Sequence, residues 1–231
     1  MNIALIVAAG SGTRMGKTDK PKQFIVVKDK PVLIYSLEAF NKNDLIDAII
    51  VVTSAQYIDQ IKKWCEEYKL IKVKDVVLGG KTRQESVYNG LCSAEDISLN
   101  PNNDIVLIHD AARPLISQEI INSNVLACQK FDAVTTVVNA SDTIVRSVNG
   151  DVIDDVPARN ELFHSQTPQS FKLAHILLAH QEAIENGVEN VTDDAQLMDL
   201  IGLDVHLVKG DKHNFKITTA DDLLMLEALL K

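Results

Sequence analysis

Cysteine is scarce in this sequence: the 231 residues contain three, Cys65, Cys92 and Cys128. An odd number of widely spaced cysteines fits neither a disulfide framework nor a pair of ligands for zinc. We therefore expect reduced, buried thiols in a cytoplasmic protein.

Basic residues are outnumbered. Lysine and arginine total 23 against 32 aspartates and glutamates, which gives a formal net charge of −9 at pH 7. This balance argues against non-specific nucleic-acid binding, which depends on basic residues that neutralise phosphates. An anionic ligand would need a pocket with basic residues of its own.

The sequence also lacks a long hydrophobic run at its start. The apolar stretch after Met1 ends in Gly10-Ser11-Gly12, and no basic segment precedes it. A stretch of about nine residues is too short to span a membrane. We interpret it as a buried first strand and expect no membrane partner.

Short apolar runs alternate with longer amphipathic stretches. Helices are indicated by apolar residues spaced three and four apart, and the runs between them predict strands. This alternation predicts an α/β fold with a mostly parallel sheet flanked by helices. The rhythm changes at about residues 139–170, where the turn pair Asn149-Gly150 indicates a hairpin. We expect a single domain, residues 1–231, with a protruding β-arm there.

A glycine-rich loop, residues 8–16, follows the first expected strand. Glycines let backbone N–H groups approach phosphate oxygens closely. The loop is neither a dinucleotide fingerprint, because Met15 replaces a glycine, nor a P-loop, because Ser11 replaces one. Arg14 and Lys22 would place two cations beside the loop, as suits a nucleotide triphosphate. The alternative is a plain glycine turn with two solvated cations.

Further polar clusters follow later strands, where ligands collect in open α/β sheets. Gly80 and Ser86 lie at an expected helix N-terminus. Asp110 could hold Mg²⁺ or its water shell, and Arg113 could clamp a phosphate. Lys216 would point to the edge of the sheet. Each could instead be structural, and we interpret the neighbouring His109 as a packing or hydrogen-bonding residue, since an ionised phosphate nucleophile needs no base.

Five short motifs occur here in one order: Gly-x-Gly-Thr-Arg-Met, Pro-Lys-Gln-Phe, His-Asp-Ala-Ala-Arg-Pro, Thr-Pro-Gln-Ser-Phe and Lys-Ile-Thr-Thr. Together they closely resemble the family of 2-C-methyl-D-erythritol 4-phosphate and ribitol-5-phosphate cytidylyltransferases, over roughly residues 2–230. The resemblance implies a Rossmann-like nucleotidyltransferase fold, a Mg²⁺ requirement and a homodimer in which the arms are exchanged. It also implies that CMP passes from CTP to a small polyol phosphate and that pyrophosphate is released.

The resemblance assigns roles to individual residues. It implies that the cytidine nucleotide is held by Ala8, Ala9, Gly10, Gly12, Gly80 and Ser86. Catalysis would depend on Arg14, Lys22 and Lys216. The polyol phosphate would meet Asp110, Arg113, Thr167 and Lys216, together with Thr143 and Arg159 from the partner's arm.

The acceptor is the open question at this stage. The His-Asp-Ala-Ala-Arg-Pro motif and residues 192–195 are more similar to the methylerythritol enzymes, which we favour. The arm is more similar to the ribitol enzymes, and Val145 stands where many methylerythritol enzymes carry lysine. A nucleotidyltransferase for another nucleotide and a non-catalytic nucleotide-binding protein are the rival classes. A dehydrogenase is disfavoured by Met15.

Overall fold

The computed structural model describes residues 1–10, 20–189 and 191–230. Within them, seven strands form one sheet in the order β5-β4-β1-β6-β8-β7-β9. The strands are β1 (Asn2–Val7), β4 (Ala48–Thr53), β5 (Val73–Leu78), β6 (Ile105–Asp110), β7 (Ala133–Asn139), β8 (Phe163–Lys172) and β9 (His206–Lys209). β8 is antiparallel to both neighbours, and the other pairs are parallel. The predicted α/β fold with a mostly parallel sheet is confirmed.

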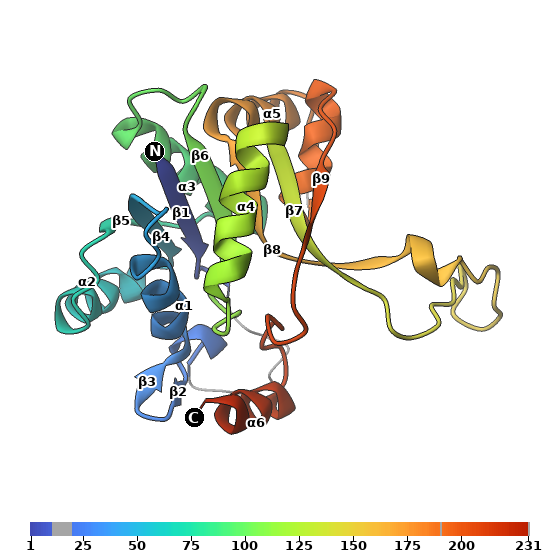
Figure 1. The fold of residues 1–231 in the computed structure, drawn as a ribbon, viewed down its shortest axis with the longest axis horizontal. Helices are drawn as coiled ribbons and strands as arrows, with labels where there is room; N and C mark the ends of the chain where they lie inside the picture. Colours follow the sequence, from blue (N-terminus) through green and yellow to red (C-terminus); the bar gives the residue numbers. More distant parts are fainter. Residues whose placement is uncertain (11–19, 190, 231) are drawn as a thin grey trace.

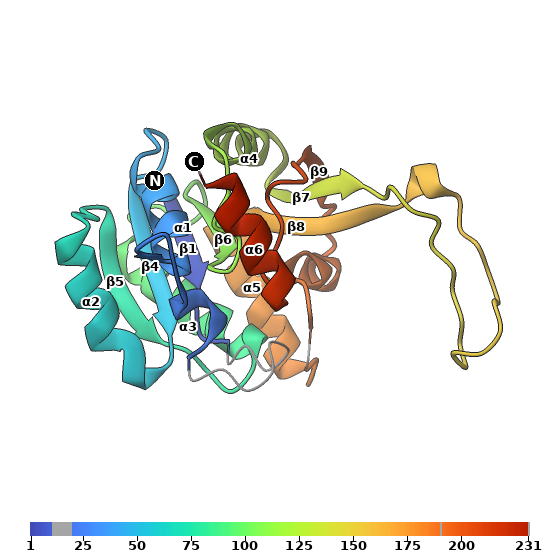
Figure 2. The ribbon, with the colours of Figure 1, turned by 90° about the horizontal axis from the view of Figure 1, so that it is seen from below.

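Helices cover both faces of the sheet (Figures 1 and 2). They are α1 (Val32–Asn41), α2 (Ile58–Glu67), α3 (Arg83–Ile97), α4 (Gln118–Phe131) and α5 (Leu173–Glu185). The last helix, α6 (Ala220–Leu229), lies beyond the end of the sheet and packs through Leu226 against Val27 and Val32 (Figure 1). Side chains of β1 alternate between two cores: Ala4 and Ile6 pack with α1, α2 and α4, whereas Ile3 and Leu5 pack with α3 and α5. This two-sided burial explains why the strand is apolar throughout.

The arm is the far end of a β7–β8 hairpin. Asn139 at the end of β7 pairs with Phe163 at the start of β8, and residues 140–162 between them project from the body (Figures 1 and 2). Residues 163–170, which fall within the range expected for the arm, thus belong to β8 in the sheet. Gly150 has a φ of +78° at the predicted turn. Apolar side chains along the arm remain exposed, among them Val148, Val152 and Ile153.

Two smaller features were not predicted. β2 (Val26–Val27) and β3 (Lys30–Pro31) form a short hairpin, and η5 (Asp194–Ile201) is a 3-10 helix. In the hairpin turn Lys28 and Asp29 both have positive φ, at 46° and 67°. Such turns usually contain asparagine or glycine, so this one carries no sequence signal.

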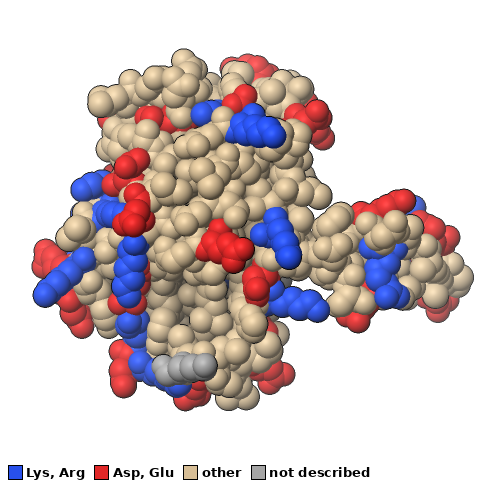
Figure 3. All heavy atoms as spheres, viewed as in Figure 1, with Lys and Arg blue, Asp and Glu red and all other residues tan. Residues whose placement is uncertain are grey.

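Acidic and basic residues are interspersed on the face shown in Figure 3. No helix among the described residues is long and apolar enough to cross a membrane.

Gly90 allows α3 to approach the sheet. A Cβ there would lie 2.3 Å from Leu5 Cδ1 and 2.6 Å from Val52 Cγ2, both in the closely packed core. We expect Gly90→Ala to lower the free energy of unfolding by about 1–3 kcal/mol through overpacking, although alanine favours helix. Urea denaturation measures the change, with Asp96→Ala on the exposed side of α3 as control. A Gly90→Ala protein as stable as the unmodified chain would contradict this packing.

Candidate functional site

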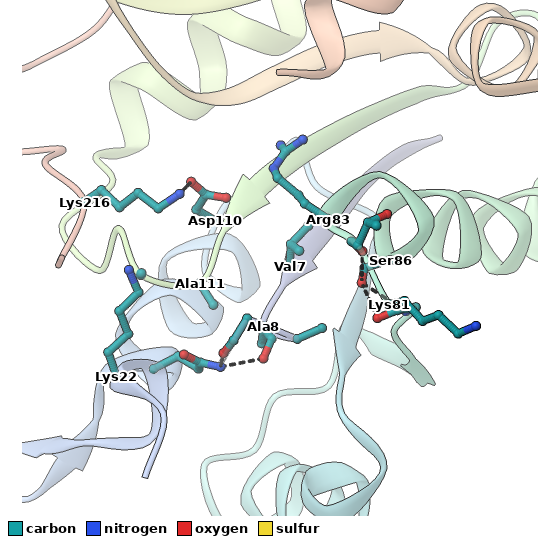
Figure 4. Close-up of a pocket in the computed structure, with 15 residues that line it drawn as sticks. Val7, Ala8, Lys22, Lys81, Arg83, Ser86, Asp110, Ala111 and Lys216 are labelled. Carbon is teal, nitrogen blue, oxygen red and sulfur yellow. Dashed lines mark hydrogen bonds and ion pairs between the residues drawn. The ribbon is translucent and has the colours of Figure 1, made fainter. Parts of the chain in front are cut away.

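The main cavity, of about 420 Å³, lies where β1 and β6 end. Ala8, Ala9 and Gly10 follow β1 directly and line it. Because parallel strands end at one edge of the sheet, these residues meet Asp110 at the end of β6 (Figure 4). Gly80, Ser86, Lys22 and Lys216 also line the cavity. The structure thus brings together most of the sequence-predicted site, while Gly12 and Arg14 lie outside the described residues.

Gln23 supports the glycine loop and was missed as a site residue. Its Nε2 donates hydrogen bonds to the carbonyl oxygens of Ala8, at 2.7 Å, and Gly10, at 2.8 Å. These bonds occupy carbonyl oxygens that would otherwise repel an anion. Gln23 lies in the 3-10 helix η2 (Lys22–Phe24), next to Lys22, whose Nζ donates to the carbonyl of Ile217. Its place inside the Pro-Lys-Gln-Phe motif was the only sequence signal.

The second glycine turn is fixed by the start of α3. Thr82 caps this helix and accepts the N–H of Glu85 at 3.0 Å. Ser86 Oγ accepts the N–H of Gly80 at 3.0 Å and donates to the carbonyl of Thr82 at 2.8 Å. A Cβ at Gly80 would come within 2.2 Å of the Glu85 side chain, so the turn requires glycine. The predicted role of Ser86 toward a base or ribose stays a prediction.

Asp110 is the buried anion at the centre of the site. Its Oδ2 lies 2.7 Å from Lys216 Nζ and 3.8 Å from Arg113 Nε. Burial favours the neutral acid, but the positive charges of Lys216, Arg83 and Arg113 outweigh it and hold the pKa of Asp110 far below its usual range. The carboxylate is therefore ionised at neutral pH.

His109 links three parts of the site through neutral hydrogen bonds. Its Nε2 lies 3.1 Å from the carbonyl of Arg113, which can only accept, so we assign the proton to Nε2. Nδ1 then accepts from Thr167 Oγ1 at 3.1 Å, and that hydroxyl accepts the N–H of Asp110. Complete burial lowers the pKa of His109 to about 4. The predicted hydrogen-bonding role is confirmed.

A second cavity, of about 220 Å³, adjoins the first. Arg113 and Thr167 line it, and Arg113 is fixed there by donating to the carbonyls of Asn214, at 2.8 Å, and Ser165, at 3.4 Å. Three residues line both cavities: Asp110, Lys216 and Arg83. Every described residue that lines the smaller cavity has a polar or charged side chain; the others are Ser165, Gln166, Gln169, Thr192 and Asp193.

The two arm residues lie apart from these cavities. Arg159 donates to Thr143 Oγ1 at 2.9 Å, and both side chains are exposed on the arm. Neither is among the described residues that line the two cavities.

No cluster of three or more His, Cys, Asp or Glu side chains suited to a metal ion occurs among the described residues. Among the described residues that line the main cavity, Asp110 is the acidic one, and its Oδ2 is already paired with Lys216 Nζ. A divalent ion here would need most of its ligands from a substrate and from water, as Mg²⁺ bound to a nucleotide commonly does.

Comparison with known proteins places these features in a family. The family model of 2-C-methyl-D-erythritol 4-phosphate cytidylyltransferase matches residues 2–231. A ribitol-5-phosphate cytidylyltransferase of Vibrio parahaemolyticus is 43% identical over 230 residues, covering 100% of this chain and 96% of the relative. A 2-C-methyl-D-erythritol 4-phosphate cytidylyltransferase of Clostridium novyi is 42% identical, with 100% and 96% covered. The crystal structure of 4-diphosphocytidyl-2C-methyl-D-erythritol synthase from Anaerococcus prevotii matches with a TM-score of 0.84 and 32% identity, over 99% of this chain and 95% of that one.

The site combines the glycine turn after β1 with Lys22, Lys216 and Asp110 at the end of β6. On a Rossmann-like sheet, this combination defines a nucleotidyltransferase. The match over nearly the whole chain specifies the nucleotide class as well. The chain belongs to the family of 2-C-methyl-D-erythritol 4-phosphate cytidylyltransferases, which here includes relatives named for ribitol 5-phosphate. It is a cytidylyltransferase.

The low pKa of His109 makes stability depend on pH in a defined window. Between pH 6.5 and about 4 the unfolded histidine binds a proton and the folded one does not, so acid favours unfolding. We expect the free energy of unfolding to fall by about 3 kcal/mol at most across this window because of His109. The pKa values of Asp110 and Asp194 are also lowered, but these two groups affect stability below pH 3.8, the ordinary pKa of an aspartate, and so outside this window.

Urea denaturation at several pH values, compared between the unmodified protein and His109→Gln, isolates this contribution. Glutamine keeps one donor and one acceptor but cannot titrate. The variant should show a smaller loss of stability between pH 6.5 and 4. Equal losses in the two proteins would contradict a neutral, buried His109.

Proposed function

We propose that this cytidylyltransferase transfers CMP from CTP to D-ribitol 5-phosphate and releases pyrophosphate. The observation that carries the choice of acceptor is the wholly polar lining of the smaller cavity. A ribitol chain carries a hydroxyl on every free carbon, whereas the methyl branch of 2-C-methyl-D-erythritol 4-phosphate would find no apolar side chain among the described residues that line this cavity. The ribitol relative from Vibrio supports the same choice.

The methylerythritol acceptor, favoured by the sequence motifs, remains the second candidate. The matching family model and the Anaerococcus structure support it. Both acceptors react through an oxygen of their phosphate, so the chemical step is the same whichever acceptor the enzyme uses.

The nucleotide occupies the main cavity, with its phosphates against the loop at Gly10 and near Lys22. An oxygen of the acceptor phosphate attacks the α-phosphorus of CTP; the new O–P bond forms as the bond to the β-phosphate oxygen breaks. Lys22, Lys216 and Arg14 stabilise the charge that develops, and Arg113 and Thr167 bind the acceptor. The nucleophile is already ionised and needs no general base.

Mg²⁺ fits this arrangement if the nucleotide supplies most of its ligands and Asp110 contributes its second carboxylate oxygen, Oδ1. The ion would neutralise charge on the phosphates and help to orient them. The ion pair of Asp110 with Lys216 then serves a second purpose, because it orients the carboxylate before any ion arrives.

The exposed apolar side chains of the arm support a homodimer. In this assembly the arm of one subunit would bring Thr143 and Arg159 to the acceptor cavity of its partner. Free Cys65, Cys92 and Cys128 suit the reducing cytoplasm as the place of action.

Pyrophosphate release with CTP and Mg²⁺ tests the function, with D-ribitol 5-phosphate and 2-C-methyl-D-erythritol 4-phosphate compared in parallel. We expect a higher kcat/KM for ribitol 5-phosphate, and a fall of roughly 100-fold or more in Lys22→Ala because a phosphate-stabilising charge is lost. Omission of Mg²⁺ should abolish turnover. Preference for the methylerythritol substrate would contradict the proposed acceptor, and release with neither would contradict both.

Mixing two inactive variants tests the shared site. Arg159→Ala and Lys22→Ala damage different halves of one site if the arm crosses to the partner. We expect a 1:1 mixture, with subunit exchange verified by mass, to regain up to about a quarter of normal activity, since about half of the dimers are mixed and one of the two sites in each mixed dimer is intact. Arg146→Ala on the same arm is the control for non-specific damage. Mixed dimers that stay inactive would contradict sharing.

A further inference from the structure

Arg83 lies at the junction of the two cavities, together with Asp110 and Lys216. Figure 4 shows its side chain on the same side of the site as Asp110, away from Ala8 and Lys22. This side belongs to the smaller cavity, in which Arg113 and Thr167 are also found. Arg83 therefore stands next to the place where a bound acceptor would present its phosphate.

Asp194 holds Arg83 in place. Arg83 Nη2 donates to Asp194 Oδ2 at 2.6 Å, and the Asp194 side chain is 2% exposed. The carboxylate is itself backed by His180, with Nε2 at 3.5 Å from Oδ1, and the Asp194 N–H donates to Gln169 Oε1 at 3.1 Å. A charge buried so completely is costly unless its partner is well placed.

The other end of the guanidinium has no such partner. Arg83 Nη1 is buried and makes no hydrogen bond to the described residues. An unpaired buried donor of a charged group is unfavourable. The planar guanidinium could satisfy it by donating to a phosphate oxygen while Nη2 stays bound to Asp194.

We propose that Arg83 is a further substrate-binding residue for the acceptor phosphate, and that Asp194 is a positioning residue that aims Arg83 at it. This inference rests on the proposed reaction, because it gives Arg83 a phosphate to bind. It places three cations around that phosphate: Arg83, Arg113 and Lys216. Asp110 and Asp194 separate these like charges while the site is empty.

Steady-state kinetics with each substrate varied in turn tests the proposal. We expect Arg83→Gln to lower kcat/KM for the acceptor roughly 10- to 100-fold, the loss typical of one charge-assisted hydrogen bond, while KM for CTP changes less than about threefold. Arg83→Lys keeps the charge without the planar fork and should fall between. Asp194→Asn should lower the same parameter but add nothing in the Arg83→Gln background, because it acts through Arg83.

The double variant also removes the buried acid that Arg83→Gln alone would leave unpaired, so a folded protein is available for measurement. Lys30→Gln is the matched control: the Lys30–Glu38 ion pair measures 2.7 Å, and Lys30 is as exposed as Arg83, at 26%, yet lies away from both cavities. It should leave kinetics unchanged. Equal acceptor kcat/KM in Arg83→Gln and the unmodified protein, or additive losses in the double variant, would overturn the proposal.

Calorimetric binding of ribitol 5-phosphate and of 2-C-methyl-D-erythritol 4-phosphate separates this inference from the proposed function. If Arg83→Gln weakens the binding of either acceptor about tenfold or more, the result supports the phosphate contact. This holds even if the unmodified protein transfers CMP to neither acceptor and the proposed function fails. Affinity that is the same with and without Arg83, or no binding of either acceptor to the unmodified protein, overturns the inference.

Discussion

The ionised carboxylate of Asp110, buried among Lys216, Arg113 and Arg83, is the interaction on which the site depends. Three cations this close would repel one another without it, and the buried carboxylate would be neutral without them. The cations keep the carboxylate ionised, and the carboxylate holds the cations close together. The result is a locally basic region inside a protein whose net charge is −9.

The sheet determines where this cluster can form. β1 and β6 are parallel neighbours, so the glycine turn after β1 and Asp110 at the end of β6 emerge at one edge. β8 is antiparallel and brings Thr167 beside Asp110 from the opposite direction, where His109 joins them by neutral hydrogen bonds. The main cavity and the smaller cavity thus share one boundary, formed by Asp110, Lys216 and Arg83.

Sequence reasoning located the residues whose position follows from strand order. Asp110 and Arg113 come directly after an apolar run, and Lys22 lies in a motif beside the glycine loop, so a parallel sheet predicts their meeting. The β-arm was also predicted, because the turn pair Asn149-Gly150 is a strong local signal. The role of the arm in a dimer stays a prediction.

Other parts depend on contacts that no local pattern records. Arg83 and Asp194 are 111 residues apart, and their ion pair forms only because α3 and η5 pack on the same face of the sheet. Gln23 acts through its contacts with the backbone of a loop before it in the chain. The preference for the methylerythritol acceptor came from short motifs, whereas the polar side chains on which the ribitol proposal rests come together only in the folded cavity.

A crystal structure with the non-hydrolysable analogue in which a methylene group joins the α- and β-phosphates of CTP, together with ribitol 5-phosphate, would test the central claim most directly. Our account predicts the cytidine and its phosphates in the main cavity, with the α-phosphorus at the boundary formed by Asp110 and Lys216. The acceptor phosphate should lie in the smaller cavity, in line for attack. A nucleotide bound elsewhere, or an acceptor phosphate remote from this boundary, would contradict it.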